Sequence, residues 1–196
     1  MIKKKSEVRI AIFASGSGTN AQNMIEYFRE HPIVEISLIV SNKPNAYVLK
    51  RAEKENVPHV LLSGKDWEEN GLAARVLKDH QIDSIVLAGY LRLLPSWLIK
   101  KYPGKIINIH PALLPKYGGK GMYGEHVHRA VISSGDKHSG ITIHHVNEEY
   151  DKGDIIFQAQ CPVLPSDTPE SLAARIHELE YEHYPKVLEK LIMSNV

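Results

Sequence analysis

Four short apolar runs rich in β-branched residues recur along the first half of the chain. They cover Val8 to Ala14, Val34 to Val40, Val57 to Leu62 and Ile82 to Ala88. Runs of this length and composition are typical of buried parallel strands, and the segments between them are long enough for crossover helices. Helical patterns lie in three of these segments: after the first run, at about residues 46–55 and at about residues 67–80. This order predicts a doubly wound α/β layer of the nucleotide-binding kind.

The second half departs from this regular alternation. A strand expected at residues 105–110 is followed by a Pro- and Gly-rich loop and a short helix at about residues 125–133. Two further strands, at about 140–146 and 154–161, are separated by only seven residues, which favours an antiparallel hairpin. Thr168 and Pro169 are suited to start the last helix as N-cap and first helical residue.

Together these patterns predict one α/β domain over residues 1–196. The expected fold is a single-domain, Rossmann-like, three-layer structure with a mixed, mostly parallel central sheet and a C-terminal antiparallel hairpin and helix. We expect two halves within this domain, at about residues 1–100 and 101–196. A chain of 196 residues, 43% of them hydrophobic, is long enough for one sizeable core.

Composition excludes several classes of partner. Lys and Arg number 24 against 23 Asp and Glu, and no basic block is long enough to follow a nucleic-acid backbone. No stretch approaches the roughly 20 apolar residues that cross a bilayer. We therefore expect a soluble, cytoplasmic protein that binds neither nucleic acid nor membrane.

The stretch ASGSGTNA at residues 14–21 follows the first apolar run and satisfies the G-x-G-x-x-G/A pattern. Such a turn offers backbone N-H groups and a helix dipole to a phosphate. A dinucleotide site would also need an acidic residue after the second strand, where Ser41-Asn42-Lys43 stands instead. Lys43 could meet a 2′-phosphate, and the glycines could serve a tight turn alone, but Thr19 and Asn20 favour a monophosphate ligand.

Asn108 and His110 alternate with isoleucines at the end of their strand, so both side chains lie on one face at the edge where α/β sheets bind ligands. A polar pair satisfied by loop backbone is the alternative. A carboxylate from residues 148–151 that reached His110 would raise the pKa of its imidazole. A protonated histidine beside an asparagine amide would stabilise an oxyanion. The remaining histidine pairs, 126/128 and 144/145, lack metal-binding spacing, so no metal is expected.

The segments GSGTN, LAGYLRLLP, INIHPALLPKY and DKGDIIFQ occur in this order and at these separations. Jointly they closely resemble the folate-dependent phosphoribosylglycinamide formyltransferase family, from about Val8 to the last helix. The resemblance implies transfer of a formyl group from 10-formyltetrahydrofolate to the amine of N1-(5-phosphoribosyl)glycinamide in de novo purine biosynthesis. It also implies a co-substrate without a metal, small-molecule partners only, and a monomer or homodimer.

The resemblance further implies that residues 1–100 form a phosphate-binding half and residues 101–196 a catalytic and folate-binding half, and it implies roles for individual residues. Asn108, His110 and Asp151 match the catalytic trio. Gly18, Thr19, Asn20 and Glu180 match positions that bind the phosphorylated substrate, the first three at its phosphate. Leu91, Arg92, Leu93, Leu94 and Asn108 match the folate site, and Lys65 falls near its outer part. After Tyr117 the chain departs from the common pattern with residues 118–125, whose glycines predict a mobile loop close to the reacting centre.

Alternatives remain within and outside this family. Methionyl-tRNA formylation would call for an additional C-terminal domain, and hydrolysis of 10-formyltetrahydrofolate for an N-terminal regulatory domain. We expect neither in 196 residues. A non-catalytic nucleotide-binding module would use the turn at Gly16 but would need no trio.

Overall fold

The structure is a computed structural model that describes residues 8–194. Its contacts group the chain into two compact units, one ending at Ile106 and one beginning at Ile107. The first contains β1 (Val8–Phe13), α1 (Thr19–Phe28), β2 (Val34–Ser41), α2 (Tyr47–Lys54), β3 (His59–Leu61), the 3-10 helix η1 (Gly64–Trp67), α3 (Leu72–Asp79), β4 (Ser84–Leu87) and α4 (Ser96–Lys101). The second contains β5 (Ile106–His110), whose first residue closes the first unit, α5 (Glu125–Ser134), β6 (His138–His145), β7 (Ile155–Pro162) and α6 (Pro169–Met193).

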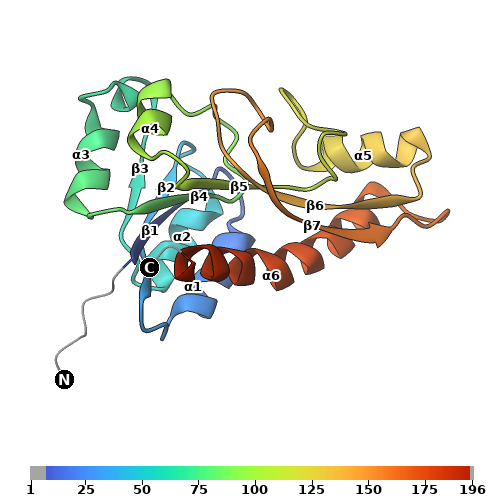
Figure 1. Ribbon diagram of the computed structural model, residues 1–196, viewed down its shortest axis with the longest axis horizontal. Coiled ribbons are helices and arrows are strands. Elements are labelled where there is room, and N and C mark those ends of the chain that lie inside the picture. Colours follow the sequence, from blue (N-terminus) through green and yellow to red (C-terminus); the bar gives the residue numbers. More distant parts are fainter. Residues whose placement is uncertain (1–7, 195–196) are drawn as a thin grey trace. The chain divides into compact units, whose positions relative to one another are not determined.

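In the first unit the strand order is β3-β2-β1-β4, and each of these pairs is parallel. The middle strand β1 is buried on both faces, with Ile10, Ile12 and Phe13 fully inaccessible. Because crossovers between parallel strands are right-handed, the direction of each step fixes the face that its helix covers. Figure 1 shows α1 and α2 on one side of these strands and α3 and α4 on the other. This is the predicted layer, with the glycine turn at the carboxyl end of β1.

Three details of this unit differ from expectation. The third strand forms its ladder only over His59–Leu61, and the following helix starts at Leu72 instead of near residue 67. The intervening η1 is closed by a reciprocal cap between Ser63 and Asp66, and Gly71 donates its N-H to Glu68. These local hydrogen bonds stop a helix at Trp67, since side chain and backbone compete there with the helical pattern. The short α4 was not expected.

In the second unit β6 pairs antiparallel with both β5 and β7. The predicted hairpin is therefore confirmed, and its first strand also pairs with β5. Thr168 caps α6 by accepting a hydrogen bond from the Ser171 N-H, with Pro169 as first residue, as predicted. Helix α6 packs on β6, β7 and α5, and its fully buried Tyr184 donates a hydrogen bond to the Ile107 carbonyl.

The seven strands follow the order β3-β2-β1-β4-β5-β6-β7 in a mixed, mostly parallel sheet. The expected α/β Rossmann-like fold class with a C-terminal antiparallel hairpin and helix is confirmed. A single formyltransferase domain over residues 1–196 stays a prediction, and its outermost residues, 1–7 and 195–196, lie outside the described part. No helix within residues 8–194 is long and apolar enough to cross a membrane.

Candidate active site

Asn108, His110 and Asp151 come together in the second unit. Asn108 and His110 lie on β5, and Asp151 lies in the segment between β6 and β7 with a left-handed φ of 54°. The Asp151 Oδ2 lies 3.6 Å from His110 Nδ1, and its Oδ1 lies 3.5 Å from Asn108 Nδ2. The His110 residue is only 3% exposed. Residues far apart in the sequence thus form a compact, mostly buried polar cluster.

The His110 ring contacts a hydrogen-bond acceptor at each nitrogen. Its Nε2 lies 2.7 Å from the carbonyl oxygen of Tyr117, which only accepts, so Nε2 carries a proton. Burial lowers the pKa of His110, and this effect outweighs the Asp151 carboxylate and the Tyr117 carbonyl, which both raise it. The expected effect of a carboxylate is present, but the net shift of the His110 pKa is downward. Asp151 acts in the expected direction, but desolvation of a nearly inaccessible ring is larger.

Asp151 is held as an anion. Burial by itself raises the pKa of this carboxyl, but the nearby imidazoles of His144 and His110 and the Gly119 N-H together keep its pKa below the ordinary range. The Gly119 amide donates to Oδ2 at 2.9 Å. The glycine-rich segment after Tyr117 therefore contacts the cluster, and its expected motion stays a prediction.

His144 is a member of this cluster that the sequence reasoning missed. It lies opposite Asn108 in the β5–β6 register and is 2% exposed. Its Nδ1 donates to the His145 carbonyl at 2.8 Å, and its Nε2 accepts from Asn108 Nδ2 at 3.1 Å. The sequence held a weak signal, since His144 ends a strand, but its pairing with β5 was not foreseen. This bond fixes the orientation of the Asn108 amide.

Glu180 lies on α6 and is 5% exposed. It accepts a hydrogen bond from His177 Nδ1 at 2.9 Å, which raises the pKa of His177. Its charge also acts on His110 and on the buried His128 of α5. Glu180 thus belongs to the polar surroundings of His110 in this unit.

The glycine turn of the first unit has the geometry of an anion-binding helix start. Gly18 adopts a left-handed φ of 71° as N-cap of α1, and no side chain caps this helix end. Thr19 and Asn20 are the first two residues of α1. Two residues of α2 donate hydrogen bonds to this turn. The Val48 N-H donates to the Gly16 carbonyl, and the Arg51 guanidinium donates to the Ser17 carbonyl. A helix start of this shape is the kind that binds an anion through backbone N-H groups.

Residues 91–94, which were expected to line a folate site, differ in exposure and in whether they line a pocket. Leu91 and Leu93 are about half exposed, whereas Leu94 is 5% exposed. Arg92, Leu93, Leu94 and Lys65 line one open pocket of about 580 Å³, and the Arg92 guanidinium lies over the Trp67 ring. Leu91 does not line this pocket, but its N-H is held by the Ser15 hydroxyl. The structure thus brings Lys65 together with three of the four segment residues.

Two other kinds of site receive no support. Within residues 8–194 no group of three or more His, Cys, Asp or Glu is placed to hold a metal ion. The single cysteine, Cys161, is buried, and burial raises the pKa of its thiol, which disfavours a nucleophilic thiolate.

Comparison with known proteins finds one matching family, similar sequences and similar solved structures. Residues 8–188 match the family described as formyl transferase. Phosphoribosylglycinamide formyltransferase from Haemophilus influenzae is 39% identical over 186 residues, which cover 92% of this chain and 85% of the relative. The chloroplastic enzymes of the same name from Vigna unguiculata and Arabidopsis thaliana are each 40% identical across 96% and 92% of this chain, which spans only 62% and 64% of their lengths. The solved structure of glycinamide ribonucleotide transformylase 1 from Geobacillus kaustophilus superposes with a TM-score of 0.85 at 40% identity, covering 94% of this chain and 98% of that one.

Proposed function

Because the chain belongs to the formyl transferase family, we propose that it transfers a formyl group from 10-formyltetrahydrofolate to the amine of N1-(5-phosphoribosyl)glycinamide in de novo purine biosynthesis. The observation that carries this proposal is the buried cluster of Asn108, His110 and Asp151. An amide, an imidazole and a carboxylate in one desolvated site suit acyl transfer through a tetrahedral intermediate.

The reaction begins when the substrate amine attacks the formyl carbon. Negative charge then develops on the formyl oxygen, where the Asn108 amide stabilises it as a hydrogen-bond donor and protonated His110 stabilises it through its charge. One N-H of the Asn108 amide bonds His144, and the other faces Asp151 Oδ1 at 3.5 Å, a long contact that this N-H exchanges for the oxyanion. Burial disfavours the imidazolium form of His110, and the negative charge that develops on the oxyanion acts in the opposite direction and favours it.

Asp151 has two roles: it favours the charged form of His110, and it assists transfer of the proton from the attacking amine. Its anionic carboxylate favours the imidazolium form of His110, and an ordered water at the carboxylate carries the proton from the attacking amine to the folate nitrogen. The carbon–nitrogen bond to the folate then breaks, which yields the formylated amine and tetrahydrofolate. No metal takes part in these steps.

Different residues bind the two substrates, the phosphorylated amine and the folate. The N-H groups at Gly18, Thr19 and Asn20 bind the single phosphate, and Glu180 contributes a further contact to the same substrate. Leu91, Arg92, Leu93, Leu94 and Asn108 hold the folate, with Lys65 at its outer part. The pocket shared by Lys65, Arg92 and two leucines suits a flat ring with an anionic tail. The protein acts in the cytoplasm as a monomer or homodimer on small molecules, without nucleic acid or membrane.

The test is formyl transfer from 10-formyltetrahydrofolate, followed by the absorbance of the deformylated folate, with and without the phosphoribosyl amine. We expect a signal only when the amine is present. Equal signals would mean a 10-formyltetrahydrofolate hydrolase, and no signal in either reaction would favour a non-catalytic nucleotide-binding module.

Asp151→Asn should narrow the active pH range. Asn keeps an acceptor for the Gly119 N-H but removes the negative charge that raises the pKa of His110. The pKa of His110 should therefore fall further, so the imidazolium is lost at a lower pH. We expect the alkaline midpoint of kcat/KM, which reports the free enzyme, to move to lower pH.

Asp154→Asn is the matched control, because this exposed aspartate lies three residues later in the same connection. Its profile should coincide with that of the wild type. An unchanged alkaline midpoint in Asp151→Asn would contradict the proposed role of the carboxylate.

A further inference from the structure

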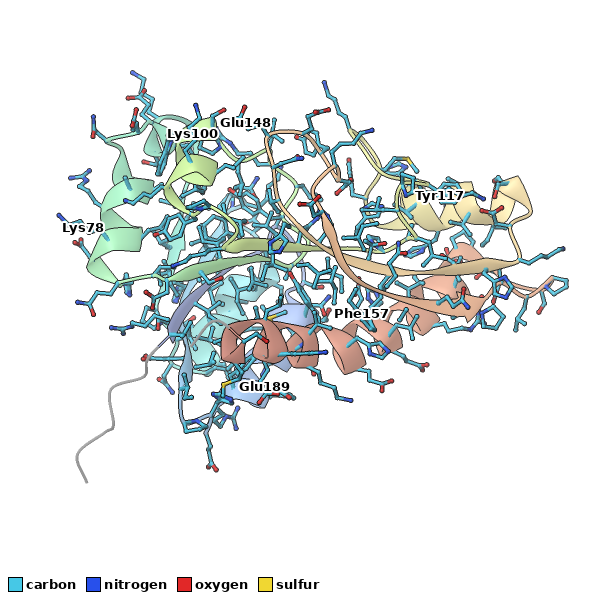
Figure 2. The ribbon with its side chains drawn as sticks, in the orientation of Figure 1. Lys78, Lys100, Tyr117, Glu148, Phe157 and Glu189 are labelled. Atoms are coloured by element: carbon cyan, nitrogen blue, oxygen red, sulfur yellow. The ribbon has the colours of Figure 1, made fainter. Side chains whose placement is uncertain are left out.

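The phenol of Tyr117 is anchored away from the cluster that its backbone contacts. Its hydroxyl donates to Asp136 Oδ2 at 2.8 Å and lies 2.5 Å from Ser134 Oγ. Lys116 Nζ pairs with the same Asp136 carboxylate at 3.0 Å. Figure 2 shows Tyr117 next to α5, whose C-terminal end carries Ser134. The side chain of Tyr117 is thus held at the end of α5, while the backbone carbonyl of the same residue accepts a hydrogen bond from His110.

The backbone at Tyr117 depends on this anchor. Its φ is 57°, in the left-handed region that L-residues other than glycine seldom occupy. Gly118 and Gly119 follow at once, and glycines give the chain wide conformational freedom. The Gly119 N-H bond to Asp151 holds the segment two residues further on, and the phenol contacts hold Tyr117 itself, with its carbonyl 2.7 Å from His110 Nε2. The position of that oxygen therefore rests in part on a side chain that points elsewhere.

We propose that Tyr117 is a positioning residue, whose phenol, held by Asp136, fixes its backbone carbonyl on His110 Nε2 so that the imidazolium has an acceptor at each nitrogen. A charged imidazole has two N-H donors, and a buried donor without a partner is destabilised. Asp151 faces Nδ1 at 3.6 Å, and the Tyr117 carbonyl supplies the second acceptor. This proposal rests on the proposed function for its kinetic consequence but not for its effect on His110.

Other groups also act on the His110 imidazole. Asp151 from the β6–β7 connection and Glu180 from α6 raise its pKa, while His144 of β6 lowers it. Electrostatic interaction also couples His110 with His128 of α5. Of these groups, Asp151 is bonded to the Tyr117 segment through the Gly119 N-H, so a shift after a change at the phenol reports the carbonyl together with any change at that bond.

Tyr117→Phe is the direct test, because it removes only the hydroxyl. The first readout is the pKa of the His110 imidazole from an NMR titration, assigned by comparison with His110→Gln. We expect a lower pKa than in the wild type, since a displaced carbonyl no longer favours the charged ring. In formyl transfer we expect kcat to fall about tenfold, with both KM values within about twofold and the alkaline midpoint at lower pH.

Tyr123→Phe makes the same chemical change at an exposed tyrosine of the same loop and should leave the His110 pKa, kcat, both KM values and the alkaline midpoint unchanged. Asp136→Asn keeps an acceptor for the phenol but loses the pair with Lys116, so a smaller shift in the same direction is expected. An unchanged His110 pKa in Tyr117→Phe with a wild-type melting temperature would overturn the proposal. An inactive wild type would refute the proposed function alone, because the titration needs no turnover.

Discussion

His110→Ala and Asn108→Ala should each lower kcat about 100-fold, because each removes one stabilising partner of the oxyanion, worth on the order of 3 kcal/mol in the barrier. The loss should appear in kcat at saturating concentrations of both substrates, since the interaction forms mainly in the transition state. Because Asn108 is also expected to contact the folate, Asn108→Ala should additionally raise the KM for 10-formyltetrahydrofolate. His110→Ala should leave both KM values nearly unchanged.

The control for the first variant is His138→Ala, which removes an exposed histidine at the start of β6. It should retain wild-type turnover. Melting temperatures are measured beforehand, because removing the His110 ring leaves the Tyr117 carbonyl without its partner, at about 1–3 kcal/mol of folding free energy. Turnover near the wild-type rate in either alanine variant would refute the proposed chemistry.

Most of the fold could be predicted because its signals are local. Runs of β-branched residues marked β1, β2 and β4, and Thr168 with Pro169 marked the start of α6. The errors lie where local hydrogen bonds override a periodic pattern. At η1 the reciprocal cap of Ser63 and Asp66 replaces a helical turn, and no window of hydrophobic periodicity contains that information.

The site was less predictable, because its decisive facts are pairings between distant segments. Asn108 and His110 share a strand, so their common face followed from alternation alone. The approach of Asp151 rested on resemblance, and the contribution of His144 required the β5–β6 register. The effect of a carboxylate on the pKa of His110 was predicted in the right direction, but the larger, opposite effect of burial was not foreseen, because desolvation depends on the whole fold.

Gly18→Ala should disable the phosphate turn. A Cβ at Gly18 would lie 2.4 Å from Val48 Cγ2 and 2.9 Å from the Val48 Cα, and the φ of 71° is itself strained for alanine. Val48 is fully buried in α2, so relief requires moving that helix or the start of α1. Two or more charge-assisted bonds to the phosphate would be lost, each worth about 1.5–3 kcal/mol. We expect the KM for the phosphoribosyl amine to rise on the order of 100-fold or more, with the KM for 10-formyltetrahydrofolate within about threefold.

Gly16→Ala is the comparison variant, because it also removes a glycine of the motif but creates no steric contact. A Cβ at Gly16 meets nothing within 4 Å, and its φ lies outside the left-handed region. This variant should therefore bind the phosphoribosyl amine as the wild type does, although it breaks the same G-x-G pattern. Equal KM values for the two variants, measured at matched folded fractions, would mean that the steric contact with Val48 does not govern phosphate binding. If only Gly18→Ala weakens binding of the phosphoribosyl amine, phosphate binding by this motif depends on the left-handed backbone conformation at Gly18.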